Sequence, residues 1–183
     1  MPNYRLLAIS GSQRKSSYNS ALVQAFISAA SENISIEVLD WSDVPLYNQD
    51  LEESFPTIVT EIKQKIAEVD GIIIATPEYN RSIPGPLKNL IDWVSRPYGQ
   101  GAWAGKPVTV VGASVGSVGT ALAHADVQKS LMFNNAHVLG QPEFYLGFAQ
   151  NKFDEQGNLT DEDTKQHIIS QLAAFTAYID TLR

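Results

Sequence analysis

Apolar residues follow two different patterns along this chain. In short unbroken runs, as in 6–9, 71–76 and 108–113, they are typical of strands buried on both faces of a sheet. Elsewhere they recur every three or four positions, which predicts amphipathic helices. The predicted strands are 4–10, 34–39, 71–76, 108–113 and 137–139. The predicted helices are 18–31, 57–68, one that starts near Pro84 to Pro86, 118–133, and a last one that begins at Thr160 with Asp163 completing a capping box.

Strands that alternate with helices in this way predict an α/β fold, in which helices cover both faces of a parallel sheet of five strands. The chain has 183 residues, the length of one domain, and we expect residues 1–183 to form it. Ligands of such sheets bind outside the carboxyl ends of the strands. Three loops leave strands at that edge, at 11–19, 77–83 and 114–119, and they hold the candidate chemistry.

The first loop reads Gly-Ser-Gln-Arg-Lys-Ser-Ser-Tyr-Asn from Gly11 to Asn19 and connects a strand to a helix. Free backbone N–H groups at a helix start attract an anion. The side chains of Ser12, Ser17 and Asn19 can donate to phosphate oxygens, and Arg14 adds charge. The loop matches neither G-x-G-x-x-G nor G-x-x-x-x-G-K-[ST], which leaves a monophosphate as the nucleotide reading. Because Ser and Asn are also preferred helix caps, a plain capping loop is the alternative.

The second and third loops suit a flat ring. Two prolines and a glycine constrain the backbone of residues 77–85, so its exposed amides can face the donor and acceptor edge of a ring. Tyr79 offers an aromatic face, and packing at the surface or at a subunit contact is its equally weighted alternative. Gly116 and Gly119 allow a backbone to approach a ligand closely. Together the three loops predict one pocket for a phosphate, a sugar chain and a planar ring.

Composition narrows the range of functions. The chain contains no cysteine, which excludes disulfides, thiolate catalysis and iron–sulfur clusters. A net charge of −7 without a basic run disfavours nucleic acid as a partner. No stretch approaches the ~20 apolar residues of a membrane span, and the N-terminal segment reads as a core strand, so we expect a cytoplasmic protein that does not enter membranes. His124, His137 and His167 have no metal-ligand spacing, and each is expected to be at the surface or lightly packed.

Two motifs together carry a resemblance to a known family. Gly11 to Asn19 is similar to G-S-x-R-x-x-S-x-N, and Pro77 to Trp93 is similar to P-E-Y-N-x-S-x-P-G-x-L-K-N-x-I-D-W. Both motifs belong to the NAD(P)H-dependent FMN reductases, and the chain most resembles their soluble quinone and chromate reductase branch. The likeness extends more weakly over nearly the whole chain. It implies a flavodoxin-like, doubly wound five-stranded parallel sheet in the order 2-1-3-4-5, with helices on both faces.

The resemblance also implies which residues hold a bound FMN. The residues expected at its phosphate are Ser12, Arg14, Ser17, Tyr18 and Asn19. The residues expected along the isoalloxazine ring are Pro77, Glu78, Tyr79, Asn80 and Ser114. Backbone N–H groups of the 114–119 loop, which includes Gly116, are candidates to stabilise negative charge on the reduced ring.

A homo-oligomer is a further implication of the resemblance, either a homodimer or a homotetramer. Family members often have a Leu-Arg pair where this chain has Val127-Gln128, and in some relatives that Arg contacts a second dimer, so both states stay open. The helix after Pro86 is the expected contact. Trp93 falls outside its apolar stripe, which predicts an exposed aromatic covered by a second subunit or by the neighbouring 97–105 loop.

The expected activity is a ping-pong hydride transfer from NADPH or NADH to quinones or similar small-molecule acceptors, such as azo dyes, chromate or free flavin. The FMN carries the chemistry, so no catalytic side chain is expected, and Glu78 is expected to fix its loop as an acceptor rather than to act as a general acid. Two other classes remain. One is a flavodoxin-type single-electron carrier without NAD(P)H turnover, whose acidic surface fits −7, and the other is a flavin-binding regulator. Consumption of NAD(P)H with a quinone separates the enzyme from both.

Overall fold

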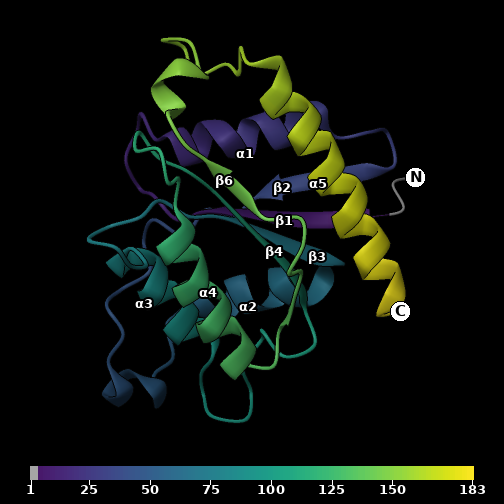
Figure 1. Ribbon diagram of the computed structural model, residues 1–183. Helices are drawn as coiled ribbons and strands as arrows, with labels where there is room; N and C mark the ends of the chain where they lie inside the picture. The colour runs from purple at the N-terminus through teal and green to yellow at the C-terminus, as the bar shows by residue number, and fades with distance from the viewer. Residues whose placement is uncertain (1–3) are drawn as a thin grey trace.

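The structure, a computed structural model, describes residues 4–183 and has a parallel sheet at its centre. Its strands run in the order β2-β1-β3-β4-β5, as the resemblance implied (Figure 1). Their bounds are β1 Tyr4–Ser10, β2 Ile34–Val38, β3 Gly71–Ala75, β4 Pro107–Ala113 and β5 His137–Val138. Every residue of β3 and β4 is buried, whereas the edge strand β2 is partly exposed. The unbroken apolar runs therefore mark the central strands, because helices cover both of their faces.

A further strand, β6 Phe144–Leu146, lies beyond the five that the sequence predicts. It pairs in parallel with the carboxyl end of β4, from Val111 to Ala113, while β5 pairs with the beginning of β4 at Pro107 and Val108. Two short strands thus share one edge of β4. The sequence pattern did not reveal β6 because a strand of three residues is too short to show an alternation.

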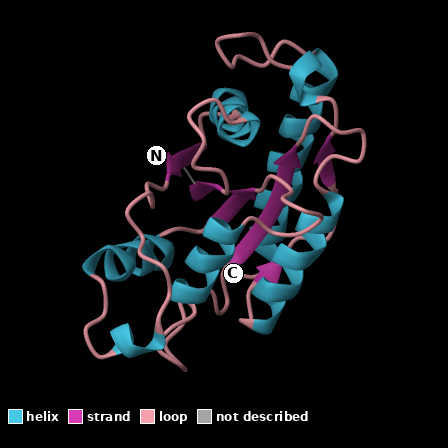
Figure 2. Ribbon diagram, turned by 90° about the vertical axis from the view of Figure 1, so that its left-hand side faces the viewer, coloured by secondary structure: helices cyan, strands magenta, loops and turns pink. Residues whose placement is uncertain are grey.

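The helices form two layers, one on each face of the sheet (Figures 1 and 2). On one face lie α1 Tyr18–Ala29 and α5 Glu162–Thr181. On the other lie α2 Thr57–Glu68, α3 Gly85–Val94 and α4 Ala121–Phe133. Two short 3₁₀ helices, η1 Gln49–Glu52 and η2 Ala149–Asn151, lie in the connections.

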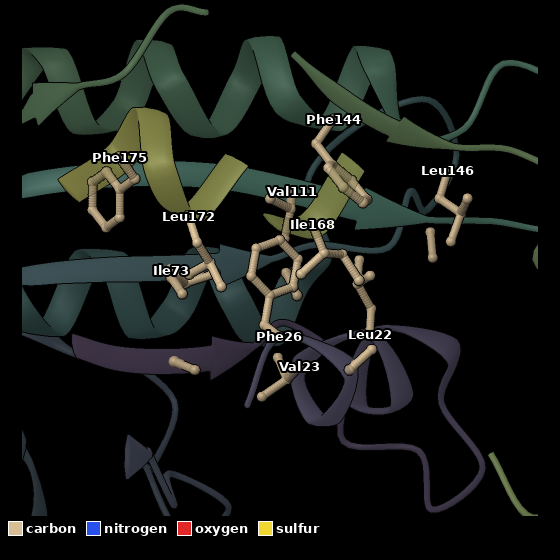
Figure 3. Packing of buried hydrophobic residues seen from close by; sticks show 14 of the residues in the cluster. Leu22, Val23, Phe26, Ile73, Val111, Phe144, Leu146, Ile168, Leu172 and Phe175 are labelled. Atoms are coloured by element: carbon tan, nitrogen blue, oxygen red, sulfur yellow. The ribbon is translucent and has the colours of Figure 1, made fainter. Parts of the chain in front are cut away.

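Successive residues of each central strand feed two separate hydrophobic clusters. Ile73 of β3 packs with Phe26 of α1 and Phe175 of α5, as Figure 3 shows. Its neighbour Ile72 belongs instead to the cluster that includes Ile62 of α2. This division follows from the strand geometry, since successive side chains point to opposite faces. The sheet is therefore held from both sides, and its carboxyl edge is a fixed frame for the loops.

The last helix starts later than the sequence predicts. Its N-cap is Asp161, whose carboxylate accepts hydrogen bonds from the backbone N–H of Thr164 at 2.9 Å and from its hydroxyl at 2.6 Å. The expected box from Thr160 to Asp163 is therefore wrong. Thr160 belongs to the preceding turn, where its N–H donates to the carbonyl of Lys152. An Asp at the next position caps as well as a Thr does, and both patterns fit the sequence.

Trp93 is not exposed, which corrects the prediction made from its place on the helix. Its side chain is fully buried, and its indole N–H donates to the carbonyl of Pro45 at 2.8 Å. The rings of Tyr47 and Phe55 meet it edge-on at 5.0 Å and 5.4 Å. The long connection between β2 and α2 therefore covers Trp93, rather than a second subunit or the 97–105 loop. Helical spacing shows which way a side chain points, but not what a distant loop lays over it.

Candidate functional site

The three candidate loops leave β1, β3 and β4 at one edge of the sheet. The chain runs outward from β1 to β2 and from β3 to β4 in opposite directions, so the topological switch lies between β1 and β3. Gly11 lies at this switch, where it links the end of β1 to the end of β3. Its N–H donates to the carbonyl of Ala75 at 2.7 Å, and a Cβ at Gly11 would lie 2.9 Å from Leu87. The first and second loops therefore start in contact, in the place where sheets of this type bind ligands.

The first loop is built around two buried polar side chains. Ser17 is the N-cap of α1, and its hydroxyl accepts from the N–H groups of Asn19 at 3.2 Å and Ser20 at 3.3 Å. The amide of Asn19 pairs with both backbone groups of Ala113 at 2.9 Å. Asn19 thus ties the start of α1 to the end of β4. Both groups are engaged inside the protein, so the capping alternative for this loop is realised at Ser17.

Residues 13–16 of this loop are exposed, and Ser12 and Tyr18 are half-buried. Arg14 is exposed, and its Nε donates to the hydroxyl of Ser16 at 3.1 Å. The backbone N–H of Arg14 donates to the hydroxyl of Ser12 at 3.3 Å. Tyr18 is half-buried against Phe153, with ring centroids 5.9 Å apart. The loop thus offers hydroxyl groups and a guanidinium at a helix N-terminus, a donor set that fits a phosphate monoester.

The second loop is a tight hairpin that is attached to α4. Tyr79 and Ser82 exchange two backbone hydrogen bonds, of 3.1 Å and 3.0 Å, around Asn80 and Arg81. One carboxylate oxygen of Glu78 accepts from the first N–H groups of α4, those of Leu122 at 3.0 Å and Ala123 at 3.2 Å. Glu78 therefore acts as an acceptor that fixes the loop, as expected. Its side chain is 9% exposed, whereas Tyr79 and Asn80 are exposed beside it and Pro77 is half-buried.

The third loop is supported by a segment that the sequence did not single out. The hydroxyl of Ser114 donates to the carbonyl of Gly119 at 2.7 Å, which closes the loop on itself. The carbonyl of Gly116 accepts from the N–H of Phe148 at 3.2 Å, and a Cβ at Gly147 would lie 2.6 Å from the carbonyl oxygen of Ser117. β6 and the residues after it therefore brace this loop. The Gly147-Phe148 pair at the end of a short apolar stretch was the one available signal for such a brace.

His124 contradicts the expectation that the three histidines are superficial. It is 1% exposed on α4, and the ring of Tyr145 meets it edge-on at 4.6 Å. Burial lowers the pKa of His124 from 6.5 to about 4, and a hydrogen bond to the backbone of Val111 partly opposes the shift. Within residues 4–183, its Nε2 and the hydroxyl of Thr120 one turn earlier have no hydrogen-bond partner. His124 is thus a neutral core residue behind the third loop, because α4 turns it toward the sheet.

Other features of the described residues lie away from the three loops. A hollow of about 240 Å³ lies between α1 and the start of α5, and none of the predicted ligand-binding residues lines it. No group of three or more His, Asp or Glu side chains gathers in a way that could hold a metal ion between residues 4 and 183. Over the same residues, each helix is too short or too polar to cross a bilayer. The three loops at the sheet edge therefore remain the candidate site, since their donors match a phosphate and their backbone frames a flat group.

Known proteins resemble this chain over almost its full length. The family model described as NADPH-dependent FMN reductase matches residues 4–151. A NAD(P)H-dependent FMN reductase of Pseudomonas aeruginosa is 43% identical over 180 residues, which are 98% of this chain and 97% of the relative. A 2-hydroxy-1,4-benzoquinone reductase of a Burkholderia species is 38% identical over 175 residues, which are 96% of each chain.

A solved structure shares the fold closely. FerB, a flavoenzyme NAD(P)H:(acceptor) oxidoreductase from Paracoccus denitrificans, superposes with a TM-score of 0.90 and is 36% identical. The match covers 97% of this chain and 98% of FerB. The loops at the sheet edge therefore lie within a fold and a sequence that this chain shares with these reductases and with FerB.

Proposed function

Since the chain belongs to the NADPH-dependent FMN reductase family, we propose that this NAD(P)H-dependent flavoenzyme transfers two electrons to quinones by a ping-pong scheme. Related small molecules that accept electrons, such as azo dyes, chromate or free flavin, belong to the same proposal. The donor is NADPH or NADH, and the resident cofactor is FMN. The observation that carries the proposal is the phosphate-binding donor set of the first loop, beside a rigid loop at the topological switch.

The residues that would hold FMN divide between its two ends. At the phosphate we propose Ser12, Arg14, Ser17, Tyr18 and Asn19. Along the ring we propose Pro77, Glu78, Tyr79, Asn80, Ser114 and Gly116. For Ser17 and Asn19 the proposed contribution is largely indirect, because their side chains fix the start of α1. The hydroxyl of Ser17 caps the helix, and the amide of Asn19 ties it to Ala113.

When bound, FMN would supply the redox chemistry, a two-electron transfer between the nicotinamide nucleotide and the acceptor. The protein would bind and orient the cofactor and shield it from water. Glu78 holds the second loop against α4, and Ser114 closes the third loop, so that neither loop must rearrange when ligands enter. Preorganised N–H groups of the third loop would favour negative charge on the ring edge. We assign no side chain a proton-transfer step.

A ping-pong scheme follows if one opening serves both substrates in turn. The first and second loops meet at Gly11, and we propose that one opening beside them serves both substrates. The test is steady-state kinetics with NADPH and a benzoquinone at several fixed quinone concentrations. Parallel double-reciprocal lines are expected, and intersecting lines would argue for two separate binding places. Mass spectrometry of the released cofactor should identify FMN, and recovery of the adenine dinucleotide would contradict the monophosphate assignment.

A flavodoxin-type carrier is the alternative, and the comparisons favour the enzyme over it. The similar curated proteins are named as reductases, including a quinone reductase of Escherichia coli K12 that is 38% identical over 183 residues. A carrier would exchange electrons with protein partners and would not consume NAD(P)H in the presence of a quinone. The steady-state assay above therefore decides between them.

We propose that residues 1–183 act as one FMN-binding domain and that the protein assembles as a homodimer or homotetramer. The side chains of Tyr98, Met132 and Phe133 are 89%, 64% and 85% exposed at the end of α4 and the neighbouring loop. A hollow of about 410 Å³ lies beside Tyr98 and Phe133. Large exposed apolar groups that gather in this way mark interaction surfaces. Light scattering at micromolar concentration should give the mass of two or four chains, and a monomer would contradict the assembly.

A further inference from the structure

The hairpin of the second loop has an unusual residue at its tip. Asn80 and Arg81 have φ angles of 52° and 64°, both in the left-handed region. Positive φ at both central residues of a two-residue hairpin defines a type I′ turn, for which Asn followed by Gly is the strongly preferred sequence. Asn80 fits its position. Arg81 occupies the position where Gly is preferred, and its side chain makes the left-handed backbone unfavourable there.

The strained turn is held in place from both ends. Glu78 accepts two N–H groups of α4 just before the turn. After it, the hydroxyl of Ser82 donates to the carboxylate of Asp126 on α4 at 2.5 Å. These contacts over-determine the backbone, which is how a residue persists in an unfavourable conformation. The tip of the hairpin is therefore rigid, and Arg81 has a fixed starting point for its side chain.

The charge of Arg81 is mostly free to act on a ligand. Its side chain is 72% exposed. Within residues 4–183 its one partner is Glu78, with Nη1 and Oε1 3.4 Å apart, the outer limit of a hydrogen bond. A guanidinium has five N–H donors, so most of them face solvent. In a protein with a net charge of −7, this cation directly follows two residues assigned to the flavin ring. A nucleotide that binds over those residues in the proposed site would lie close to this cation.

From these observations we propose that Arg81 binds a phosphate group of the reduced nicotinamide nucleotide and helps to set the preference for that donor. This inference rests on the proposed function, because it takes NAD(P)H as the substrate of this opening. Both NADH and NADPH carry a diphosphate, and NADPH carries a further 2′-phosphate. A forked guanidinium on a rigid turn suits either group. This role would explain why Arg occupies a position where the backbone favours Gly, because Gly has no charge with which to bind a phosphate.

The test replaces Arg81 with the residue that the turn prefers. In Arg81→Gly, the KM for NADPH and the dissociation constant of NADP⁺ should each rise about tenfold, the lower end of the range for a charge-assisted hydrogen bond because the group is exposed. The thermal midpoint should be equal to or above that of the parent protein, by up to about 3 °C, because Gly relaxes the turn. If Arg81→Gly binds the nucleotide more weakly but is at least as stable as the parent protein, then Arg81 contributes to binding and not to stability.

Three controls make the result specific. The donor 1-benzyl-1,4-dihydronicotinamide carries no phosphate, and its rate should be the same in the parent and in Arg81→Gly. Arg81→Lys keeps the charge but loses the forked geometry, so its KM for NADPH should lie between those of the parent protein and Arg81→Gly. Lys165→Ala removes another exposed cation, on α5 away from the loops, and should leave the KM for NADPH unchanged. An equal rise in the KM for NADH and for NADPH in Arg81→Gly would show that Arg81 binds the diphosphate. A rise in the KM for NADPH alone would show that it binds the 2′-phosphate.

Several outcomes would overturn the inference. An unchanged KM and dissociation constant in Arg81→Gly would show that no phosphate binds there. If Arg81→Gly were equally slow with the phosphate-free donor, the effect of the substitution would not arise from a phosphate contact. A change of oligomeric mass in Arg81→Gly would make Arg81 a subunit contact. If the parent protein binds FMN but does not oxidise NADPH with any acceptor, the proposed function fails as well, and this result is distinct from an active parent with an unaffected variant.

Discussion

Arg14 and Asn19 serve the same loop in different ways. The exposed guanidinium of Arg14 has one partner in its own loop, the hydroxyl of Ser16, whereas the buried amide of Asn19 is engaged with Ala113. Arg14 is therefore available to a phosphate, and Asn19 keeps the loop in position. The sequence placed both residues at the phosphate, but it could not separate these roles, because Ala113 lies far away along the chain and its contact depends on the finished sheet.

Arg14→Ala should weaken FMN binding about 10- to 150-fold, because a charge-assisted hydrogen bond contributes roughly 1.5–3 kcal/mol. Hydride transfer in the FMN-saturated protein should change much less. Fluorescence titration of the apoprotein measures the affinity, with Lys15→Ala as the control for loss of a neighbouring exposed charge. The same flavin affinity in Arg14→Ala and the parent would refute the assignment of Arg14.

His124 should make stability fall in mild acid. Its pKa is about 4 in the folded protein, below its ordinary value of 6.5, so the unfolded chain binds a proton between these values that the folded protein does not bind. Its contribution is complete above pH 6.5 and is lost as the pH falls toward 4, by up to about 3 kcal/mol. Urea unfolding at pH 7 and pH 4.5 should therefore show a smaller pH dependence in His124→Gln than in the parent. An identical pH dependence in both proteins would contradict the burial of a neutral His124.

Among the elements, α5 depends on its first residues. The carboxylate of Asp161 caps the helix and also meets Nζ of Lys152 at 2.7 Å. Lys152 first, and then the bonds to Thr164, lower the pKa of Asp161 to about 2. The cap also satisfies an N–H that has no partner within the helix, and we expect it to be the larger contribution of Asp161 to stability.

Asp161→Ala should cost about 1 kcal/mol and lower the thermal midpoint by roughly 2–4 °C. Asp161→Asn retains a capping oxygen and loses the charge, so it should cost less. Thermal unfolding followed by circular dichroism measures both variants. If Asn were as damaging as Ala, the ion pair with Lys152 rather than the cap would be the important contact.

The elements also show which features a sequence pattern can predict. Long apolar runs and helical spacing placed the central strands and all five helices, because burial on two faces or on one stripe leaves a periodic trace. The order of the strands came from the family resemblance. The pattern missed β6, the exact start of α5 and the cover of Trp93. Each of these depends on a short segment, on two equally suitable caps or on a contact between distant parts of the chain.

At the scale of the whole molecule, the candidate site is the place where separate loops are bound to one another. Gly11 joins the first loop to β3, Glu78 joins the second to α4, and Phe148 joins the third to the segment after β6. The sequence could identify the three loops, because each follows a predicted strand. It could not predict the attachments, since the partners of Glu78 and Gly116 lie on other elements. Likewise the type I′ turn at Arg81 became visible only in the folded loop.

The central claim of the proposed function is that the FMN-loaded protein oxidises NAD(P)H and reduces a quinone in two separable half-reactions. Anaerobic rapid mixing of the FMN-loaded protein with one equivalent of NADPH measures the first half directly by the loss of flavin absorbance. A second mixing with benzoquinone, after the nucleotide has been consumed, should restore the absorbance without further NADPH. Flavin that keeps its absorbance in the presence of NADPH, or that recovers only while nucleotide is bound, would contradict the account.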